Sequence, residues 1–164
     1  MKSTAAIVSC SLAFLCASPA LAQKAKPSGE LERGRYLVKT SGCNDCHTPG
    51  YPEKAGAVPE AEWLVGVPVG FQGPWGTTYP ANLRIAISAM SEAQWTANAR
   101  KPMKPPMPWF NLRDMTDADL RAIYRFVKSL GPAGKPAPAF VPPGGTVTTP
   151  FVVFAPPQAP SAPR

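Results

Sequence analysis

Histidine and cysteine are scarce in this chain of 164 residues, which contains one histidine and four cysteines. The histidine and two of the cysteines stand within five consecutive positions, in the motif Cys43-Asn44-Asp45-Cys46-His47. Elsewhere only Cys10 and Cys16 are found. A closed structural zinc site takes four ligands, chiefly Cys and His. The scarcity therefore argues against zinc and directs attention to this one motif.

The N-terminal segment has the features of a cleaved export signal. Lys2 is followed by an apolar run over residues 5–15, and small residues precede a predicted cleavage site after Ala22. Residues 1–22 are expected to be removed, which places the protein in the periplasm, peripheral to the membrane at most. An uncleaved anchor is the alternative, but serines and a proline interrupt an apolar run that is barely long enough to span a bilayer. Cleavage removes the two outlying cysteines and leaves the motif in an oxidising compartment.

Acidic residues are also few: the chain has 10 Asp and Glu residues and 17 Lys and Arg residues, which gives a net charge of +7. Loss of Lys2 with the signal lowers this charge to +6. An exported basic protein meets little nucleic acid, so the excess charge favours an acidic protein partner or a bound anion.

The best-marked helix begins after Thr116 and ends before Gly131. Thr116 is the expected N-cap, Asp119 stands at the third helical position, and Gly131 followed by proline is a stop signal. Apolar residues recur at steps of three and four over this span, which is the period of an amphipathic helix: Leu120, Ile123, Tyr124, Val127 and Leu130.

Two more helices are predicted upstream. The first covers residues 30–41 and stops at Gly42. Gly34 inside it costs about 1 kcal/mol relative to alanine, which suggests a close backbone contact there. The second is short, starts at an N-cap Ser91 with Gln94 three positions later, and ends near residue 100.

The rest of the chain is rich in glycine and proline. Residues 48–79 are expected to be loop, and a loop of this length needs something to organise it. The chain after Gly131 is proline-rich, so residues 132–164 are expected to form an extended tail beyond a domain at residues 23–131. An apolar patch at residues 151–154 leaves two possibilities open, a docked strand or a disordered tail.

Cys-x-x-Cys-His is the attachment sequence for c-type haem. Two thiols one turn apart can add to the two vinyl groups of a porphyrin, and the histidine that follows can ligate the iron. Cys43 and Cys46 are thus predicted to form thioether bonds to one covalent haem c, with His47 as the proximal ligand.

Three other functions compete for the motif. A zinc site lacks a fourth Cys or His. A thioredoxin-like dithiol is expected near a βαβ pattern, at a helix N-terminus that lowers the thiol pKa, whereas this motif follows a helix. A structural disulfide across so short a loop would constrain little and would leave His47 unexplained.

The chain resembles monohaem class I c-type cytochromes of the bacterial periplasmic type over roughly residues 30–130. Three parts carry the resemblance: Gly34-Arg35-Tyr36-Leu37 before the haem motif, Met103-Lys104-Pro105-Pro106-Met107-Pro108-Trp109, and the helix that includes residues 119–127. The resemblance implies an all-α fold, with crossed N- and C-terminal helices and short helices and loops around one haem. It also implies that Gly34 sits against Phe126 or its neighbours.

The resemblance also suggests the distal ligand. In similar cytochromes this ligand is a methionine in a proline-bearing loop before the last helix, which corresponds to Met107, with Met103 as the fallback. Flanking prolines lower the entropy cost of holding a weak thioether ligand. Met90 and Met115 are expected to fill apolar gaps.

Other side chains are weaker candidates for the haem pocket. Four aromatic residues are expected either to wall the pocket or to serve as ordinary core: Trp75, Tyr79, Trp95 and Trp109. Four cations are expected to pair with propionates, to form a docking face or to lie in solvent: Arg84, Arg100, Lys101 and Lys104.

Filled axial positions imply electron transfer, because such an iron changes oxidation state with little rearrangement and does not readily bind oxygen or peroxide. The expected function is therefore a one-electron carrier between redox partner proteins, a dehydrogenase donor and an oxidase or reductase acceptor, and not an enzyme. Two alternatives stay open: an electron-transfer subunit of a periplasmic dehydrogenase complex, and a haem peroxidase or ligand sensor if the methionine ligand is labile.

Overall fold

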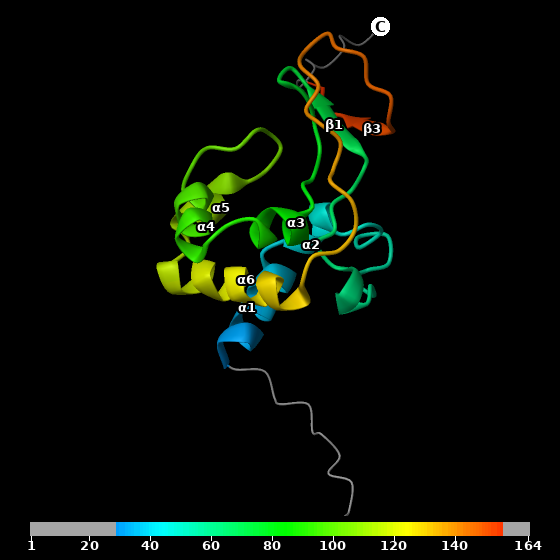
Figure 1. The fold of residues 1–164 in the computed structure, drawn as a ribbon. Helices are drawn as coiled ribbons and strands as arrows, with labels where there is room; N and C mark the ends of the chain where they lie inside the picture. Colours follow the sequence, from blue (N-terminus) through cyan, green and yellow to red (C-terminus); the bar gives the residue numbers. More distant parts are fainter. Residues whose placement is uncertain (1–28, 156–164) are drawn as a thin grey trace, which may run out of the picture.

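The computed structural model describes residues 29–155, so the predicted signal at residues 1–22 lies outside the described part. Its elements are α1 (Gly29–Thr40), α2 (Cys43–His47), the 3-10 turn η1 (Glu60–Glu62), β1 (Gly70–Gly73), β2 (Gly76–Thr78), α3 (Leu83–Ser88), α4 (Glu92–Ala99), α5 (Trp109–Asp114), α6 (Asp117–Leu130) and β3 (Phe151–Val153). The helices gather at one end of the molecule and the strands at the other (Figure 1). Within residues 29–155 no helix is long and apolar enough to cross a bilayer.

Helices α1 and α6 pack against each other at Gly34. A Cβ placed on Gly34 would lie 2.7 Å from the Cβ of Phe126 and closer still to the carbonyl oxygen of Ala122. Only a residue without a side chain lets the two backbones approach this closely. The contact of Gly34 with Phe126 is the one that the resemblance predicts, and it explains a glycine inside a helix.

The predicted helices are confirmed to within one residue at each end. At the start of α6, Thr116 Oγ1 accepts a hydrogen bond from Asp119 N at 3.1 Å. At the start of α4, Ser91 and Gln94 form a complete capping box. These caps satisfy backbone donors that a helix cannot satisfy internally, which is why they mark helix starts reliably.

Helix α3 is a feature that the sequence analysis missed. Its N-cap is Asn82, whose side-chain oxygen accepts a hydrogen bond from Ile85 N at 3.1 Å. One face is buried through Ile87. The helix is only six residues long, too short for an apolar period to stand out.

A small sheet corrects the all-helical prediction. β1 pairs antiparallel with β2, with Phe71 opposite Thr78, so part of the expected loop at residues 48–79 is a hairpin. β3, from the proline-rich tail, pairs parallel with β1 on its other edge and places Val152 opposite Phe71. Of the two possibilities for residues 151–154, the docked strand is the one present (Figure 1). Residues 156–164 lie outside the described part.

Candidate functional site

The Cys-x-x-Cys-His motif forms α2, directly after a turn at Gly42. Gly42 has a φ of 75°, a left-handed conformation in which glycine is favoured, and it lets the chain turn from α1 into α2. Asn44 is fully buried, and its side-chain oxygen accepts a hydrogen bond from Thr48 Oγ1 at 2.8 Å. Thr48 Oγ1 in turn accepts from Leu64 N at 2.8 Å. These bonds fix the motif to the loop that follows it.

Cys43 and Cys46 are both half-buried free thiols, with no disulfide between them. Burial raises the pKa of the Cys43 thiol to about 11. Burial, followed by the nearby Asp45 carboxylate, also raises the pKa of Cys46. A reactive dithiol requires the opposite shift, toward the thiolate, so the structure disfavours the thioredoxin-like alternative. Over residues 29–155, no three side chains of the His, Cys, Asp and Glu types converge on a metal position.

His47 ends α2 and is held in a defined orientation. Its side chain is 8% exposed. Nδ1 lies 2.7 Å from the carbonyl oxygen of Ala81, and since a carbonyl only accepts, Nδ1 carries the proton. Gly66 N donates to the carbonyl oxygen of His47 at 2.8 Å and fixes the backbone as well.

The second ring nitrogen of His47, Nε2, is the atom that can bind another group. Burial lowers the pKa of His47, although the hydrogen bond to Ala81 acts in the opposite direction. The neutral ring with its proton on Nδ1 leaves a lone pair on Nε2, and no group within residues 29–155 donates a hydrogen bond to that nitrogen. A histidine that gives one N–H to a carbonyl and offers the other nitrogen has the arrangement of a metal-ligating imidazole.

The two candidate distal ligands lie on residues 101–108, which connect α4 and α5 and are called the ligand loop below. Met103 and Met107 are both half-buried and pack against the core. Met107 N donates to the carbonyl oxygen of Lys104 at 3.3 Å, and Trp109 N donates to that of Met107 at 2.8 Å. Thr78 Oγ1 donates to the carbonyl oxygen of Pro105 at 2.7 Å and ties the loop to β2. The ligand loop is thus a fixed turn.

The other two methionines have structural contacts. Met115 packs against the core, as predicted. Met90 contributes its sulfur as an acceptor for Asn98 Nδ2 at 3.4 Å and its carbonyl oxygen as an acceptor for the Tyr124 hydroxyl at 2.9 Å. Neither contact involves the motif or the ligand loop.

Two of the four aromatic candidates use their polar atoms within the protein. Trp95 is a core residue, since its Nε1 donates to the carbonyl oxygen of Leu120 at 2.9 Å. The Tyr79 hydroxyl is hydrogen-bonded to Thr149 Oγ1 at 2.8 Å. Neither polar atom is therefore left over for a bound group.

The other two aromatic candidates are tryptophans in different surroundings. Trp109 begins α5, and the guanidinium carbon of Arg113 lies 5.2 Å from the centroid of its ring. Trp75 keeps a buried ring N–H without a partner among residues 29–155. Such a donor costs free energy unless a water or a bound group accepts from it.

Arg84 was expected at a propionate or on the surface, and this prediction is wrong. Its side chain is buried, with Nε donating to the carbonyl oxygen of Gly131 at 2.6 Å and Nη1 donating to that of Ala61 at 2.6 Å. Nη2 donates to the carbonyl oxygen of Leu130. Arg84 therefore caps the C-terminal end of α6, where carbonyl groups lack helical partners.

The other three cations also bind protein groups. Arg100 donates to the carbonyl oxygen of Met115 at 2.8 Å and pairs with Asp117 at 2.5 Å. Lys101 donates to Asn98 Oδ1 at 3.1 Å. The remaining one, Lys104, lies 4.5 Å above the ring centroid of Phe140.

The residue that sequence reasoning missed is Ala81. Its contribution is a backbone carbonyl, which every residue has, so no side-chain pattern marks it. Asn82 beside it offers the better signal, because an Asn before an apolar stretch is a frequent helix N-cap. That cap fixes the start of α3 and, with it, the position of the Ala81 carbonyl.

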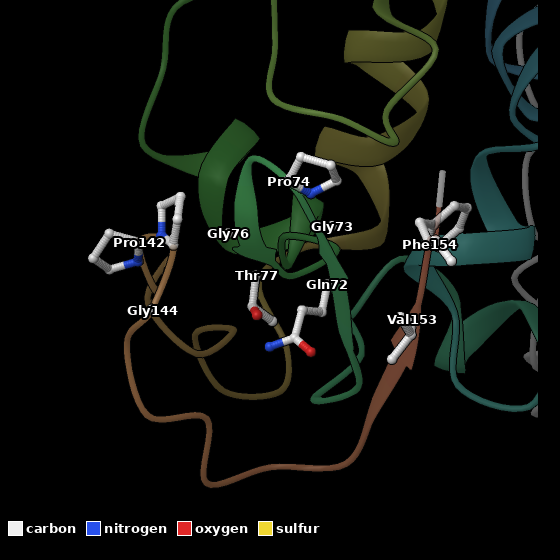
Figure 2. Close-up of a pocket in the computed structure, with 11 residues that line it drawn as sticks. Gln72, Gly73, Pro74, Gly76, Thr77, Pro142, Gly144, Val153 and Phe154 are labelled. Carbon is white, nitrogen blue, oxygen red and sulfur yellow. The ribbon is translucent and has the colours of Figure 1, made fainter. Parts of the chain in front are cut away.

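A c-type haem fits this set of residues. Two free thiols lie one turn apart on one short helix, and the next residue offers an unpaired imidazole nitrogen. A separate hollow of about 400 Å³ lies between the hairpin and the tail, and its lining includes Gln72, Pro74 and Thr77 of the hairpin and Pro142, Val153 and Phe154 of the tail (Figure 2). None of its lining residues titrates or belongs to the motif, so the chemistry belongs to α2.

Two comparisons found known proteins that resemble the chain. The family model described as cytochrome c matches residues 31–131. A protein of Pseudomonas putida (strain KT2440) that is named as a nicotinate dehydrogenase subunit is 28% identical over 121 residues, an alignment that covers 66% of this chain. The chain spans only 9% of the length of that relative. No solved structure matches the chain.

Proposed function

The chain belongs to the cytochrome c family, and we propose that it is a periplasmic one-electron carrier of the monohaem class I type, with crossed N- and C-terminal helices. In this proposal Cys43 and Cys46 form the thioether bonds, His47 Nε2 is the proximal iron ligand and Met107 is the distal one. The bound haem supplies reversible exchange between Fe(II) and Fe(III). The protein residues supply attachment, orientation and a low-polarity environment.

The observation that carries the proposal is the hydrogen bond from His47 Nδ1 to the carbonyl oxygen of Ala81. It sets the tautomer, holds the ring in one orientation and leaves Nε2 as the ligating atom. Within residues 29–155 no group is hydrogen-bonded to Nε2, so this nitrogen stays available to a bound group.

The distal role of Met107 rests on the rigidity of its loop. The hydrogen bonds from Met107 N to Lys104 and from Thr78 to Pro105 hold the turn, and prolines flank the methionine on both sides. A rigid loop loses little further entropy when its thioether binds. A methionine ligand favours Fe(II) and raises the reduction potential, which suits a carrier that accepts electrons from a dehydrogenase.

We also propose that the chain is exported. Residues 1–22 serve as the cleaved signal, residues 23–131 form the haem domain, and residues 132–164 form the tail. An exported chain would receive its haem in an oxidising compartment.

A second candidate is a cytochrome subunit that works within a larger dehydrogenase assembly. It is favoured by the similarity to a protein named as a nicotinate dehydrogenase subunit. In both candidates the chain carries electrons, and they differ only in whether its partner stays bound.

Purification of the tagged full chain from its native host tests both candidates. We expect a reduced-minus-oxidised spectrum with a sharp c-type α-band and a reversible titration that fits one electron. A dehydrogenase that co-elutes in fixed proportion would support the subunit, whereas elution alone would support the free carrier. A spectrum without the α-band would rule out both.

A further inference from the structure

Both proposed iron ligands receive support from one short stretch of chain, residues 76–82, which we call the bridging segment. On the proximal side, the carbonyl oxygen of Ala81 accepts the hydrogen bond from His47 Nδ1 at 2.7 Å. On the distal side, Thr78 Oγ1 donates to the carbonyl oxygen of Pro105, two positions before Met107, at 2.7 Å. A shift of the bridging segment would therefore disturb both ligands.

The bridging segment is itself held by the tail at three places along its length. Thr77 and Val141 exchange two backbone hydrogen bonds, Thr77 N to Val141 O at 2.8 Å and Val141 N to Thr77 O at 3.0 Å. The Tyr79 hydroxyl is hydrogen-bonded to Thr149 Oγ1 at 2.8 Å.

The third contact lies at the end of the bridging segment next to Ala81. The side-chain nitrogen of Asn82, Nδ2, donates to the carbonyl oxygens of Ala133 at 2.7 Å and of Lys135 at 3.1 Å. The same side chain caps α3. Since Asn82 is bonded directly to Ala81, these contacts restrain the carbonyl that orients His47.

The contact between tail and bridging segment is close-packed. Gly76 has a φ of 99°, and a Cβ there would meet Phe140 at 3.1 Å and the Val141 carbonyl oxygen closer still. Phe140 also reaches the ligand loop, since its ring lies under the Lys104 ammonium group at 4.5 Å. The tail thus contacts the ligand loop directly as well as through Thr78.

We propose that residues 132–155 of the tail act as a positioning clamp, which holds Met107 and His47 on the iron by immobilising the bridging segment. The inference rests on the proposed function, since it takes Met107 and His47 as the ligands. The positioning residues are Thr78, Tyr79 and Asn82, which act through the ligand loop and the Ala81 carbonyl. Without the clamp the haem would stay attached through Cys43 and Cys46, but the weak methionine bond would open more often.

Opening of the methionine bond can be measured by competition with an added ligand. Imidazole binds the iron only when Met107 has left, so its apparent affinity reports how often the bond is open. Removal of one neutral hydrogen bond changes such an equilibrium by about 1 kcal/mol, or about fivefold.

The test compares Thr78→Val and Tyr79→Phe with matched controls in the full-length holoprotein. The controls are Thr148→Val, an exposed threonine of the tail, and Tyr36→Phe on the exposed face of α1. Neither side-chain hydroxyl makes a hydrogen bond within residues 29–155. We expect each test variant to bind imidazole about fivefold more tightly than its control.

A purely structural role for these side chains would lower the unfolding midpoint and leave imidazole affinity unchanged. If both variants bind imidazole as their controls do, the clamp is wrong. If the unaltered protein already lacks the methionine-to-iron charge-transfer band, the assignment of Met107 as a ligand fails. That result would contradict the proposed function and not the clamp alone.

Discussion

Met107→Ala is expected to convert a closed haem site into an open one. The charge-transfer band between methionine sulfur and iron should disappear, and added imidazole or CO should bind readily at neutral pH. The reduction potential should fall by more than about 100 mV, a modest part of the roughly 0.8 V over which axial ligands set haem potentials. The reason is that a thioether favours Fe(II), whereas water or hydroxide in its place favours Fe(III).

Met103→Ala is the control for this prediction. Both methionines pack against the core, so each variant loses a similar apolar contact and should lose stability to a similar degree. Only the Met107 variant should change the spectrum. If Met103→Ala removes the band instead, Met103 is the ligand. If the unaltered protein lacks the band and binds CO and cyanide rapidly, the peroxidase or ligand-sensor alternative is favoured over electron transfer.

Gly34→Ala is expected to destabilise the fold by about 2 kcal/mol, a typical cost of overpacking a tight contact. The helix propensity of alanine alone would stabilise the variant by about 1 kcal/mol, so the net loss has to come from the contact with α6. The added Cβ would lie 2.7 Å from the Cβ of Phe126 and against the backbone of Ala122. Because Ala122 presents backbone there, no rotation of a side chain relieves the overlap.

Denaturant unfolding of the holoprotein, monitored by far-ultraviolet circular dichroism, measures this loss. Gly29→Ala is the matched control, because nothing lies within 4 Å of a Cβ at that position, and its stability should change by less than about 0.5 kcal/mol. Equal stability of the Gly34 and Gly29 variants would contradict the packing of α1 on α6 at Gly34.

The helices of the fold could be predicted from the sequence because their signals are local. Thr116 and Gly131 mark the ends of α6, and Ser91 with Gln94 marks the start of α4. Caps of this kind involve residues within four positions of each other, so a single stretch of sequence contains the whole interaction. The haem motif is local in the same way, since Cys43, Cys46 and His47 share one short helix.

The contacts that organise the rest of the site are distant in sequence and were not predicted. His47 reaches Ala81, Arg84 reaches Gly131, and Asn82 reaches Ala133. In each case the acceptor is a backbone carbonyl, which has no sequence signature. The sheet was not predicted for the same reason, because Phe71 and Val152 pair across about half the chain. The apolar residues of β3 are also compatible with either a strand or an unpaired tail.

The most direct test of the central claim is the intact mass of the purified protein under denaturing conditions, after expression of the full-length chain with a haem-ligation system. We predict that the purified chain exceeds the mass of residues 23–164 by one haem, and that Cys43→Ser combined with Cys46→Ser has the mass of the polypeptide alone. A full-length chain whose mass equals that of its amino acids after such expression would contradict covalent haem attachment and, with it, the proposed electron carrier.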